Sequence, residues 1–240
     1  MPNVMRRLLT AQSTWTKLFA VLWGLIPLGG LLAQSTGTAR RPHVEIRTEL
    51  GTVMVALYNE TPLHRDNFLK LVKGAAYDSL LFHRVIPGFM VQCGDPLSKL
   101  AAEGAMLGNG GPGYTLPAEI VPGLIHKRGA LAAARQGDED NPERRSNGSQ
   151  FYIVQGEPFS PEELQQVEQR SARHGLAVTY TEVEERTYAT AGGAPHLDGG
   201  YTVFGEVVEG MAVIDALAGR PCDARDRPLK DIRMFMRVLE

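Results

Sequence analysis

The stretch Phe82-His83-Arg84-Val85-Ile86-Pro87-Gly88-Phe89-Met90-Val91-Gln92 decides how this 240-residue chain is interpreted. It consists of two short apolar runs on either side of Pro87-Gly88, a residue pair that favours a turn. We therefore predict a hairpin of two short strands at this point. Within the hairpin stands Arg84, whose guanidinium stays charged and offers a fixed fork of hydrogen-bond donors.

Further short strands and two helices are predicted along the rest of the chain. His43–Tyr58 alternates apolar and polar residues around Glu49-Leu50-Gly51, which indicates a second hairpin. Four other stretches are predicted strands: 129–134, 148–154, 201–210 and 234–239. Helices are expected over Leu63–Lys73, after Thr61-Pro62, and over Met211–Ala218, before Gly219. Residues 96–118 are rich in glycine and proline and predict a long loop. The pattern indicates a mainly β domain.

Residues 157–195 stand apart from this strand pattern. Ser160-Pro161-Glu162-Glu163 is a capping box with proline at the first helical position, and it precedes a charged helical stretch, Glu162–Arg173. The stretch has no long apolar stripe. We therefore predict a helical surface insertion that packs weakly.

Three blocks resemble the cyclophilin-type peptidyl-prolyl cis-trans isomerases. Phe82–Gln92, followed by Gly94-Asp95, resembles the signature F-H-R-[VI]-I-x-x-F-x-x-Q. Residues 147–153 (NGSQFYI) are similar to N-G-S-Q-F-[FY]-I, and residues 197–205 (LDGGYTVFG) to L-D-G-x-[HY]-x-V-F-G. The blocks occur in the family's order. The resemblance runs from about Val44 to Glu240, apart from the insertion.

The resemblance implies both a fold and an activity. The fold would be a closed eight-stranded antiparallel β-barrel capped by two helices, spanning residues 43–240. The activity would be rotation of X–Pro bonds in unfolded or folding proteins, with Pro-containing segments as partners and without a cofactor or metal. The sequence contains no G-x-S-x-G, H-E-x-x-H, P-loop or C-x-x-C motif, and its six histidines show no metal-ligand spacing.

The resemblance also assigns roles to eleven positions. Arg84 would donate to the proline nitrogen, and Gln92 would orient Arg84 and contact the substrate backbone. An apolar socket for the proline ring would consist of Phe89, Met90, Tyr152 and Leu197. Ala134 and Arg135 would lie on an edge strand that binds the peptide main chain. Gln150, His196 and Tyr201 complete the expected substrate-binding set.

Four of these positions depart from the family pattern. His196 stands where tryptophan is frequent, Tyr201 where histidine is common, Arg135 where asparagine is common, and Tyr152 in place of phenylalanine. Activity remains plausible, because a phenol still offers an apolar wall and a polar tip. The insertion ends beside His196, which suggests that it overhangs the pocket and filters substrates.

Other interpretations of the same residues stay open. Phe89 and Met90 could be barrel core, and Arg84 could be a structural ion-pair partner. A cyclophilin-like domain could bind Pro-containing segments without useful turnover, or the insertion could make the domain a scaffold for a partner. Cys93 and Cys222 could form a disulfide in an exported protein, but Cys93 lies in an apolar run and is expected to be a free, buried thiol.

The N-terminal residues 1–33 predict a secretory signal peptide, followed by a linker at 34–42. Arg6, Arg7 and Lys17 precede a 16-residue apolar stretch, Leu18–Ala33, which is shorter than the roughly 20 residues of a membrane span. Export to the periplasm is expected, with an uncleaved inner-membrane anchor facing outward as the alternative. Cleavage removes these three positive charges and takes the formal net charge from -2 to -5. That balance argues against nucleic acid as a partner.

Overall fold

The computed structural model describes residues 40–239, so the expected signal peptide, and all of the expected linker except residues 40–42, lie outside the described residues. Eight strands form one sheet in the order β10-β1-β2-β9-β6-β8-β4-β3, and every neighbouring pair is antiparallel. These strands are β1 (His43–Thr48), β2 (Gly51–Leu57), β3 (Arg84–Ile86), β4 (Met90–Cys93), β6 (Ala130–Ala133), β8 (Phe151–Val154), β9 (Val203–Glu209) and β10 (Phe235–Leu239). Two further short strands, β5 (Thr115–Leu116) and β7 (Ser146–Asn147), pair with each other.

The sheet curls, but the expected closed barrel is not confirmed. Register shifts between Met54 and Val55 and between Leu131 and Ala132 bend the central strands. The end strands β3 and β10 do not pair as a ladder. The segments before them meet instead, through backbone hydrogen bonds from Phe82 N to Ile232 O, from Met234 N to Leu80 O and from Ser79 N to Met234 O. Three residues of β3 are too few to complete the barrel.

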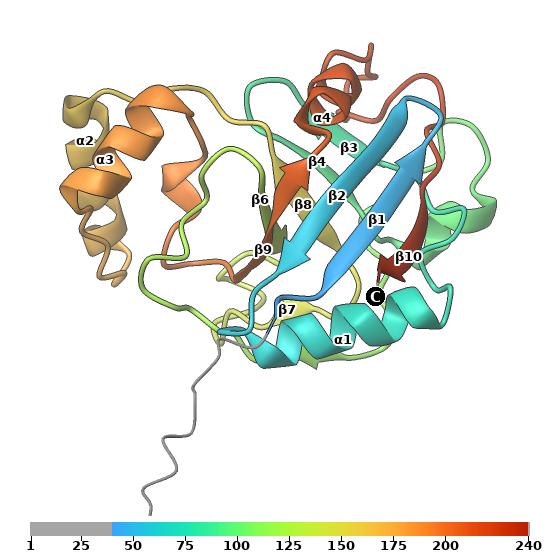
Figure 1. Ribbon diagram of the computed structural model, residues 1–240, viewed down its shortest axis with the longest axis horizontal. Coiled ribbons are helices and arrows are strands. Elements are labelled where there is room, and N and C mark those ends of the chain that lie inside the picture. The colour runs from blue at the N-terminus through green and yellow to red at the C-terminus, as the bar shows by residue number, and fades with distance from the viewer. Residues whose placement is uncertain (1–39, 240) are drawn as a thin grey trace, which may run out of the picture. The chain divides into compact units, whose positions relative to one another are not determined.

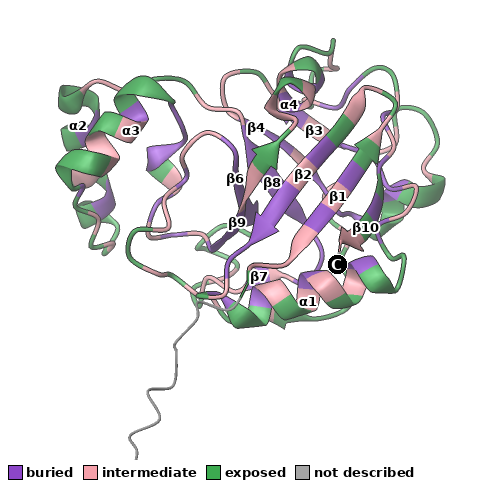
Figure 2. Cartoon of the chain, viewed as in Figure 1, coloured by how far each residue is buried: buried purple, intermediate pink, exposed green. Residues whose placement is uncertain are grey.

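The two predicted flanking helices lie near opposite ends of the curled sheet (Figure 1). They are α1 (Pro62–Lys73) and α4 (Met211–Ala218). Pro62 occupies the first turn of α1, where its missing N–H costs nothing, and Gly74 ends the helix. Phe68 and Val72 on one side of α1 are buried against the sheet, whereas the opposite side is exposed (Figure 2).

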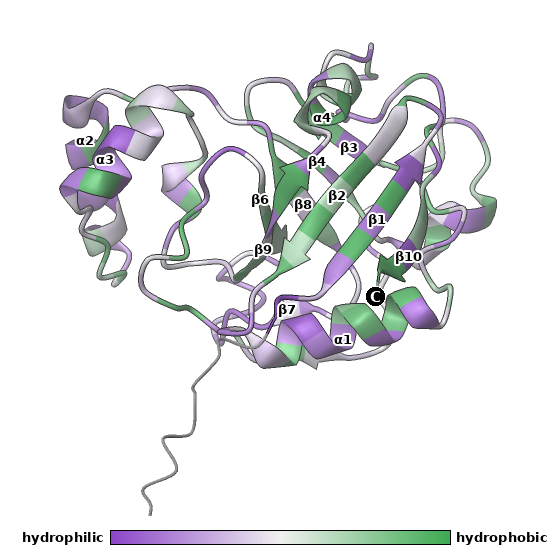
Figure 3. Ribbon diagram, viewed as in Figure 1, coloured by the Kyte–Doolittle hydropathy of each residue, from purple (hydrophilic) through white to green (hydrophobic). Residues whose placement is uncertain are grey.

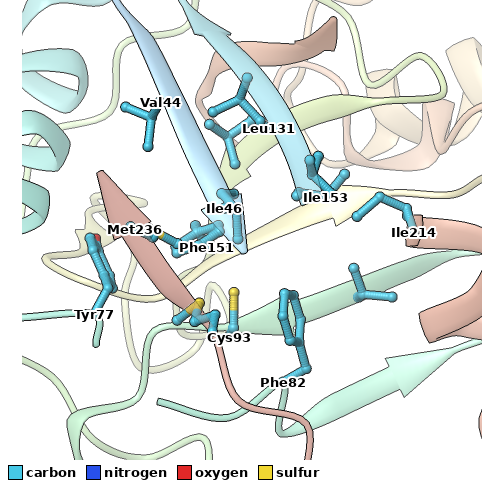
Figure 4. Packing of buried hydrophobic residues seen from close by; sticks show 14 of the residues in the cluster. Val44, Ile46, Tyr77, Phe82, Cys93, Leu131, Phe151, Ile153, Ile214 and Met236 are labelled. Carbon is cyan, nitrogen blue, oxygen red and sulfur yellow. The ribbon is translucent and has the colours of Figure 1, made fainter. Parts of the chain in front are cut away.

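The main core fills the space inside the curled sheet. Its side chains come from all eight strands of the sheet, from both flanking helices and from the segments before β3 and β10, and several are drawn in Figure 4. Phe82, Cys93 and Phe151 are at most 2% exposed. Strand β2 is largely hydrophobic, whereas β1 alternates between hydrophobic and hydrophilic residues (Figure 3). Cys93 and Cys222 are free thiols, as expected.

The insertion is helical, as predicted, but it does not pack weakly. It contains α2 (Pro161–Arg173) and α3 (Glu182–Thr190), which lie together to one side of the sheet (Figure 1). Leu164, Val167, Tyr180 and Tyr188 form a buried cluster with Ile125 of the preceding loop. The sequence pattern of α2 alone could not show this, because most of the apolar partners come from other segments.

Two short 3-10 helices complete the described elements: η1 (Pro96–Leu100) in the long loop, and η2 (Pro195–Leu197) at the end of the insertion. Among residues 40–239, no helix is both long and apolar enough to cross a membrane.

Candidate active site

The β3–β4 hairpin places the two expected catalytic side chains next to each other. Arg84 and Gln92 are direct cross-strand partners, and so are Ile86 and Met90. The turn between the strands needs Gly88, whose φ of 73° lies in the left-handed region. The sequence order Pro-Gly between two apolar runs therefore fixes the register that brings Arg84 beside Gln92.

A pocket of about 270 Å³ opens beside this hairpin. It is lined by His83, Arg84, Phe89, Met90, Gln92, Leu107, Gly108, Asn109, Ala134, Arg135, Tyr152, Leu197, Tyr201 and Arg225. Nine of the eleven expected site residues are among them. The lining contains three arginines and no carboxylate, and each arginine has an aspartate partner outside the lining: Asp226 for Arg84, Asp138 for Arg135 and Asp223 for Arg225.

Arg84 points into the pocket with little to restrain it. Its side chain is 44% exposed, and its Nε lies 3.6 Å from Oδ2 of Asp226. An exposed ion pair of this kind contributes about 0–1 kcal/mol. The guanidinium is thus held loosely enough to donate to a bound substrate.

Gln92, which was expected to orient Arg84, has its side-chain amide held by Gln150. Its Nε2 donates to Oε1 of Gln150 at 2.9 Å. The amide of Gln150 in turn donates to the carbonyls of Gly108 and Gly110. Gln150 is buried and does not line the main pocket; it lines an adjoining cavity of about 370 Å³ together with Gln92. In the described structure Gln150 therefore supports Gln92 and the loop at residues 108–110.

The apolar part of the pocket comes from three separate chain segments. Met90 and Tyr152 are buried, whereas Phe89 and Leu197 are partly exposed. The hydroxyl of Tyr152 lies 3.0 Å from Nε2 of His126, which is behind the pocket wall. Phe89 packs against His196, with 5.0 Å between ring centroids. His196 thus contacts the socket from outside and does not line it; its burial lowers its pKa from 6.5.

The expectation of an edge strand at Ala134 is wrong. Strand β6 lies in the interior of the sheet, between β9 and β8. Just past its end, Ala134 N donates to Gln150 O, and Ala134 O accepts from Asn147 N. Its main chain is therefore already paired. Arg135 follows, and its backbone N–H and C=O have no hydrogen-bond partner among residues 40–239, so main-chain pairing with a peptide is possible there.

Two of the departures from the family pattern form one unit. The guanidinium of Arg135 lies over the ring of Tyr201, 4.2 Å from its centroid. It also donates to Gly200 O and forms an ion pair with Asp138, and the side chain is only 6% exposed. Arg135 therefore fixes the Tyr201 wall, and most of its charge is already neutralised.

Sequence reasoning did not assign five of the pocket residues to the site. His83 lines the pocket, and its burial lowers its pKa from 6.5. Leu107, Gly108 and Asn109 belong to the long glycine-rich loop, and Arg225 comes from the segment before β10. Apart from the adjacency of His83 to Arg84, no motif marks these positions. In residues 40–239, no group of three His, Cys, Asp or Glu side chains is placed to hold a metal ion.

Comparison with known proteins gives the same family as the three sequence blocks. The family described as cyclophilin type peptidyl-prolyl cis-trans isomerase/CLD matches residues 43–237. A peptidyl-prolyl cis-trans isomerase of Acinetobacter baylyi is 33% identical over 199 residues, which cover 82% of this chain and 81% of the relative. A Streptococcus pyogenes protein, described as a bifunctional phosphatase/peptidyl-prolyl cis-trans isomerase, is 36% identical over 196 residues. That match covers 80% of this chain but only 37% of the streptococcal protein.

Solved structures agree with the fold. A cyclophilin type isomerase of Cryptosporidium parvum superposes with a TM-score of 0.60 at 25% identity, over 83% of this chain and 98% of the other. The same parasite protein has also been solved in the presence of the dipeptide Ala-Pro. The chain belongs to the cyclophilin-type peptidyl-prolyl cis-trans isomerases.

Proposed function

We propose that this isomerase rotates X–Pro bonds by holding the proline ring against Met90 and Tyr152 while Arg84 donates to the proline nitrogen. The observation that supports this most is the convergence of a loosely held guanidinium and a buried apolar wall on one pocket. Phe89 and Leu197 extend the apolar wall, and Tyr201 with Arg135 forms a further side of the pocket.

The chemistry requires a modest reduction of a known barrier. Rotation about an X–Pro bond is opposed by roughly 18–20 kcal/mol and takes tens to hundreds of seconds. A turnover of about 10–1000 per second needs roughly 4–7 kcal/mol off that barrier. Neither a nucleophile nor a bond-breaking step is required.

Arg84 meets this requirement because the nitrogen changes as the bond twists. The planar amide nitrogen shares its lone pair with the carbonyl, whereas the twisted nitrogen keeps it. A donor aimed at that lone pair binds the twisted state better than the planar state, which is the condition for catalysis. Once a bound peptide excludes water from the pocket, a charge-assisted hydrogen bond from Arg84 could contribute about half of the required energy.

The remaining residues would bind and orient the peptide. Gln92, held by Gln150, would contact the substrate backbone, and Arg135 would pair with it through its main chain. Ala134, whose backbone is occupied, would contribute its methyl group to the pocket wall. His196 would act only through its packing on Phe89.

A binding module without useful turnover is the second candidate, and the altered residues His196 and Tyr201 favour it. Exchange NMR on a short Ala-Pro peptide separates the two. With enzyme far below the peptide concentration, an isomerase produces exchange cross-peaks between cis and trans proline signals. A binding module would shift and broaden peptide signals at high protein concentration without producing those cross-peaks, and that result would contradict the isomerase proposal.

We further propose that the clients are exported proteins in the course of folding. The support is the composition of residues 1–33, a basic start followed by a short apolar stretch. Expression of the full chain in a bacterium, followed by fractionation and N-terminal sequencing, tests this. A periplasmic product beginning near Gln34 is expected; a product with intact residues 1–33 in the membrane fraction supports the anchored alternative, and one in the cytoplasm contradicts export.

A further inference from the structure

A buried carboxylate lies between the insertion and the pocket. Asp198 is 4% exposed, and one of its oxygens, Oδ1, accepts from the backbone N–H of His126 at 2.8 Å and faces Nδ1 of His126 at 2.6 Å. The other oxygen, Oδ2, accepts from the hydroxyls of Tyr180, at 2.9 Å, and Tyr188. A buried carboxylate is costly unless it is hydrogen-bonded, so this clustering of donors keeps it in place.

Asp198 determines which nitrogen of His126 carries the proton. With Nδ1–H donating to the carboxylate, neutral His126 presents Nε2 as an acceptor. The hydroxyl of Tyr152 lies 3.0 Å from Nε2 and, with His126 in this tautomer, donates to it. The Tyr152 ring lies nearly parallel to the His126 ring, 13° between planes, which is consistent with a held orientation.

This series of hydrogen bonds runs from the insertion at one end to the pocket wall at the other. Tyr180 and Tyr188 belong to the insertion, next to and within α3. Tyr152 belongs to β8 and forms the pocket wall. Asp198 directly follows Leu197, which also lines the pocket. The insertion is therefore connected to the proline socket through polar groups that are all at most 8% exposed.

This series of hydrogen bonds affects the pocket because Tyr152 carries a hydroxyl where the family commonly has a phenylalanine. A buried hydroxyl without a partner is destabilising, and it can turn its ring to find one. If His126 or Asp198 shifts, the Tyr152 ring loses its fixed position against the proline ring. Displacements of about 1 Å in positioning groups can lower rates substantially.

We propose that Tyr180 and Tyr188 are positioning residues of the isomerase site, which act through Asp198 and His126 to fix the ring of Tyr152. This inference rests on the proposed function. On this proposal the insertion helps to orient a side chain of the pocket wall, in addition to any effect on access to the pocket.

A double-mutant cycle tests the proposal on the full chain, with kcat/KM for a short Ala-Pro peptide as the readout. Tyr188→Phe removes one hydroxyl but keeps the ring in its apolar cluster, and it is expected to lower kcat/KM about fivefold. In the Tyr152→Phe background the same substitution should change kcat/KM by less than about 1.5-fold, because the hydroxyl through which it acts is gone. Ser160→Ala, which removes the exposed cap of α2, is the matched control and should leave kcat/KM unchanged.

The outcomes separate a positioning role from a structural one. A fivefold loss in both backgrounds, no loss in either, or an equal loss in Ser160→Ala would overturn the proposal. If Tyr188→Phe does not fold, the cycle of Tyr180→Phe with Tyr152→Phe is measured instead, because Tyr180 donates to the same oxygen of Asp198. A wild-type protein without turnover on the peptide would overturn the proposed function and this inference with it.

Discussion

Arg135 and Tyr201 lie 66 positions apart in the sequence, yet the cation of one rests on the ring of the other. Each departs from the family pattern, and their joint effect appears only in space. The guanidinium of Arg135 also donates to Gly200 O and pairs with Asp138, so it holds the Tyr201 ring in place in addition to carrying a charge. A change at either position should therefore alter the shape of the pocket more than its electrostatics.

We predict that Arg135→Lys raises KM for a Pro-containing peptide about threefold to tenfold with little change in kcat. Lysine keeps the charge but cannot donate through a planar fork while it covers Tyr201. Steady-state kinetics on the Ala-Pro peptide measures both parameters. Arg144→Lys is the matched control, because Arg144 binds the same Asp138 carboxylate without lining the pocket. A fall in kcat with unchanged KM would contradict this prediction.

Residues that share a contiguous block could be predicted from the sequence. Arg84, Phe89, Met90 and Gln92 fall within nine positions, and hairpin geometry alone brings Arg84 opposite Gln92. Arg225 and Asn109 could not be predicted, because they reach the pocket from loops whose paths depend on tertiary contacts. Likewise, the pairing of Ala134 with Gln150 and Asn147 depends on strand order, which the alternation of residue types does not determine.

At the scale of elements, the insertion differs most from its prediction. Its helix α2 begins at a capping box as expected, with both hydrogen bonds of Ser160 and Glu163 present. Only Leu164, Val167 and Ser171 of α2 are buried, which is a short stripe. The partners that cover this stripe come from α3, from the segment between α2 and α3 and from the loop before β6, so the sequence of α2 could not indicate how firmly it is anchored.

We predict that Leu164→Ala lowers the free energy of unfolding by about 2–4 kcal/mol, because it removes a side chain that is 1% exposed from a formed cluster. Chemical denaturation monitored by circular dichroism measures the change. Val183→Ala, in α3 and 74% exposed, is the control and should cost less than about 0.5 kcal/mol. A cost below about 1 kcal/mol for Leu164→Ala would support the weakly packed insertion instead.

Removal of the whole insertion is less informative than point substitutions. Without residues 158–193, Asp198 would lose two of its donors, and the pocket wall would change for reasons unrelated to substrate access. A filter role for the insertion is better tested by substitutions on its surface.

For the whole molecule, three histidines couple stability to pH; His64 and His83 are buried, and His196 is more exposed. Burial lowers the pKa of His64, His83 and His196 from the ordinary value of 6.5. The unfolded chain takes up protons on these groups near pH 6.5, whereas the folded chain does so only at lower pH. The unfolded state thus binds more protons below pH 6.5, and stability rises with pH in that window.

We therefore predict that the free energy of unfolding is larger at pH 7.5 than at pH 5.5. Asp138 and Asp215, whose pKa values lie below 3.8 because of their arginine partners, do not titrate in this interval. Denaturant titrations at the two pH values measure the difference, and His64→Gln should reduce it. His174→Gln, at the exposed end of α2, is the control. Equal stability at both pH values would contradict the prediction.

The curled sheet brings the β3–β4 hairpin, the interior strand β8 and four connecting segments to a single pocket. The mainly β composition and the two flanking helices could be predicted from residue patterns. The incomplete closure could not, because it depends on β3 being only three residues long and on how residues 79–82 meet 232–234.

The central claim is that Arg84 lowers the rotation barrier by donating to the proline nitrogen. The most direct test is kcat/KM for the Ala-Pro peptide in wild type, Arg84→Lys and Arg84→Ala, each verified as folded. We expect a loss of about 100-fold in Arg84→Ala and an intermediate loss in Arg84→Lys, which keeps the charge without the fork. Turnover of Arg84→Ala within about twofold of wild type would contradict the mechanism proposed for this site. It would mean that the guanidinium does not lower the barrier to rotation.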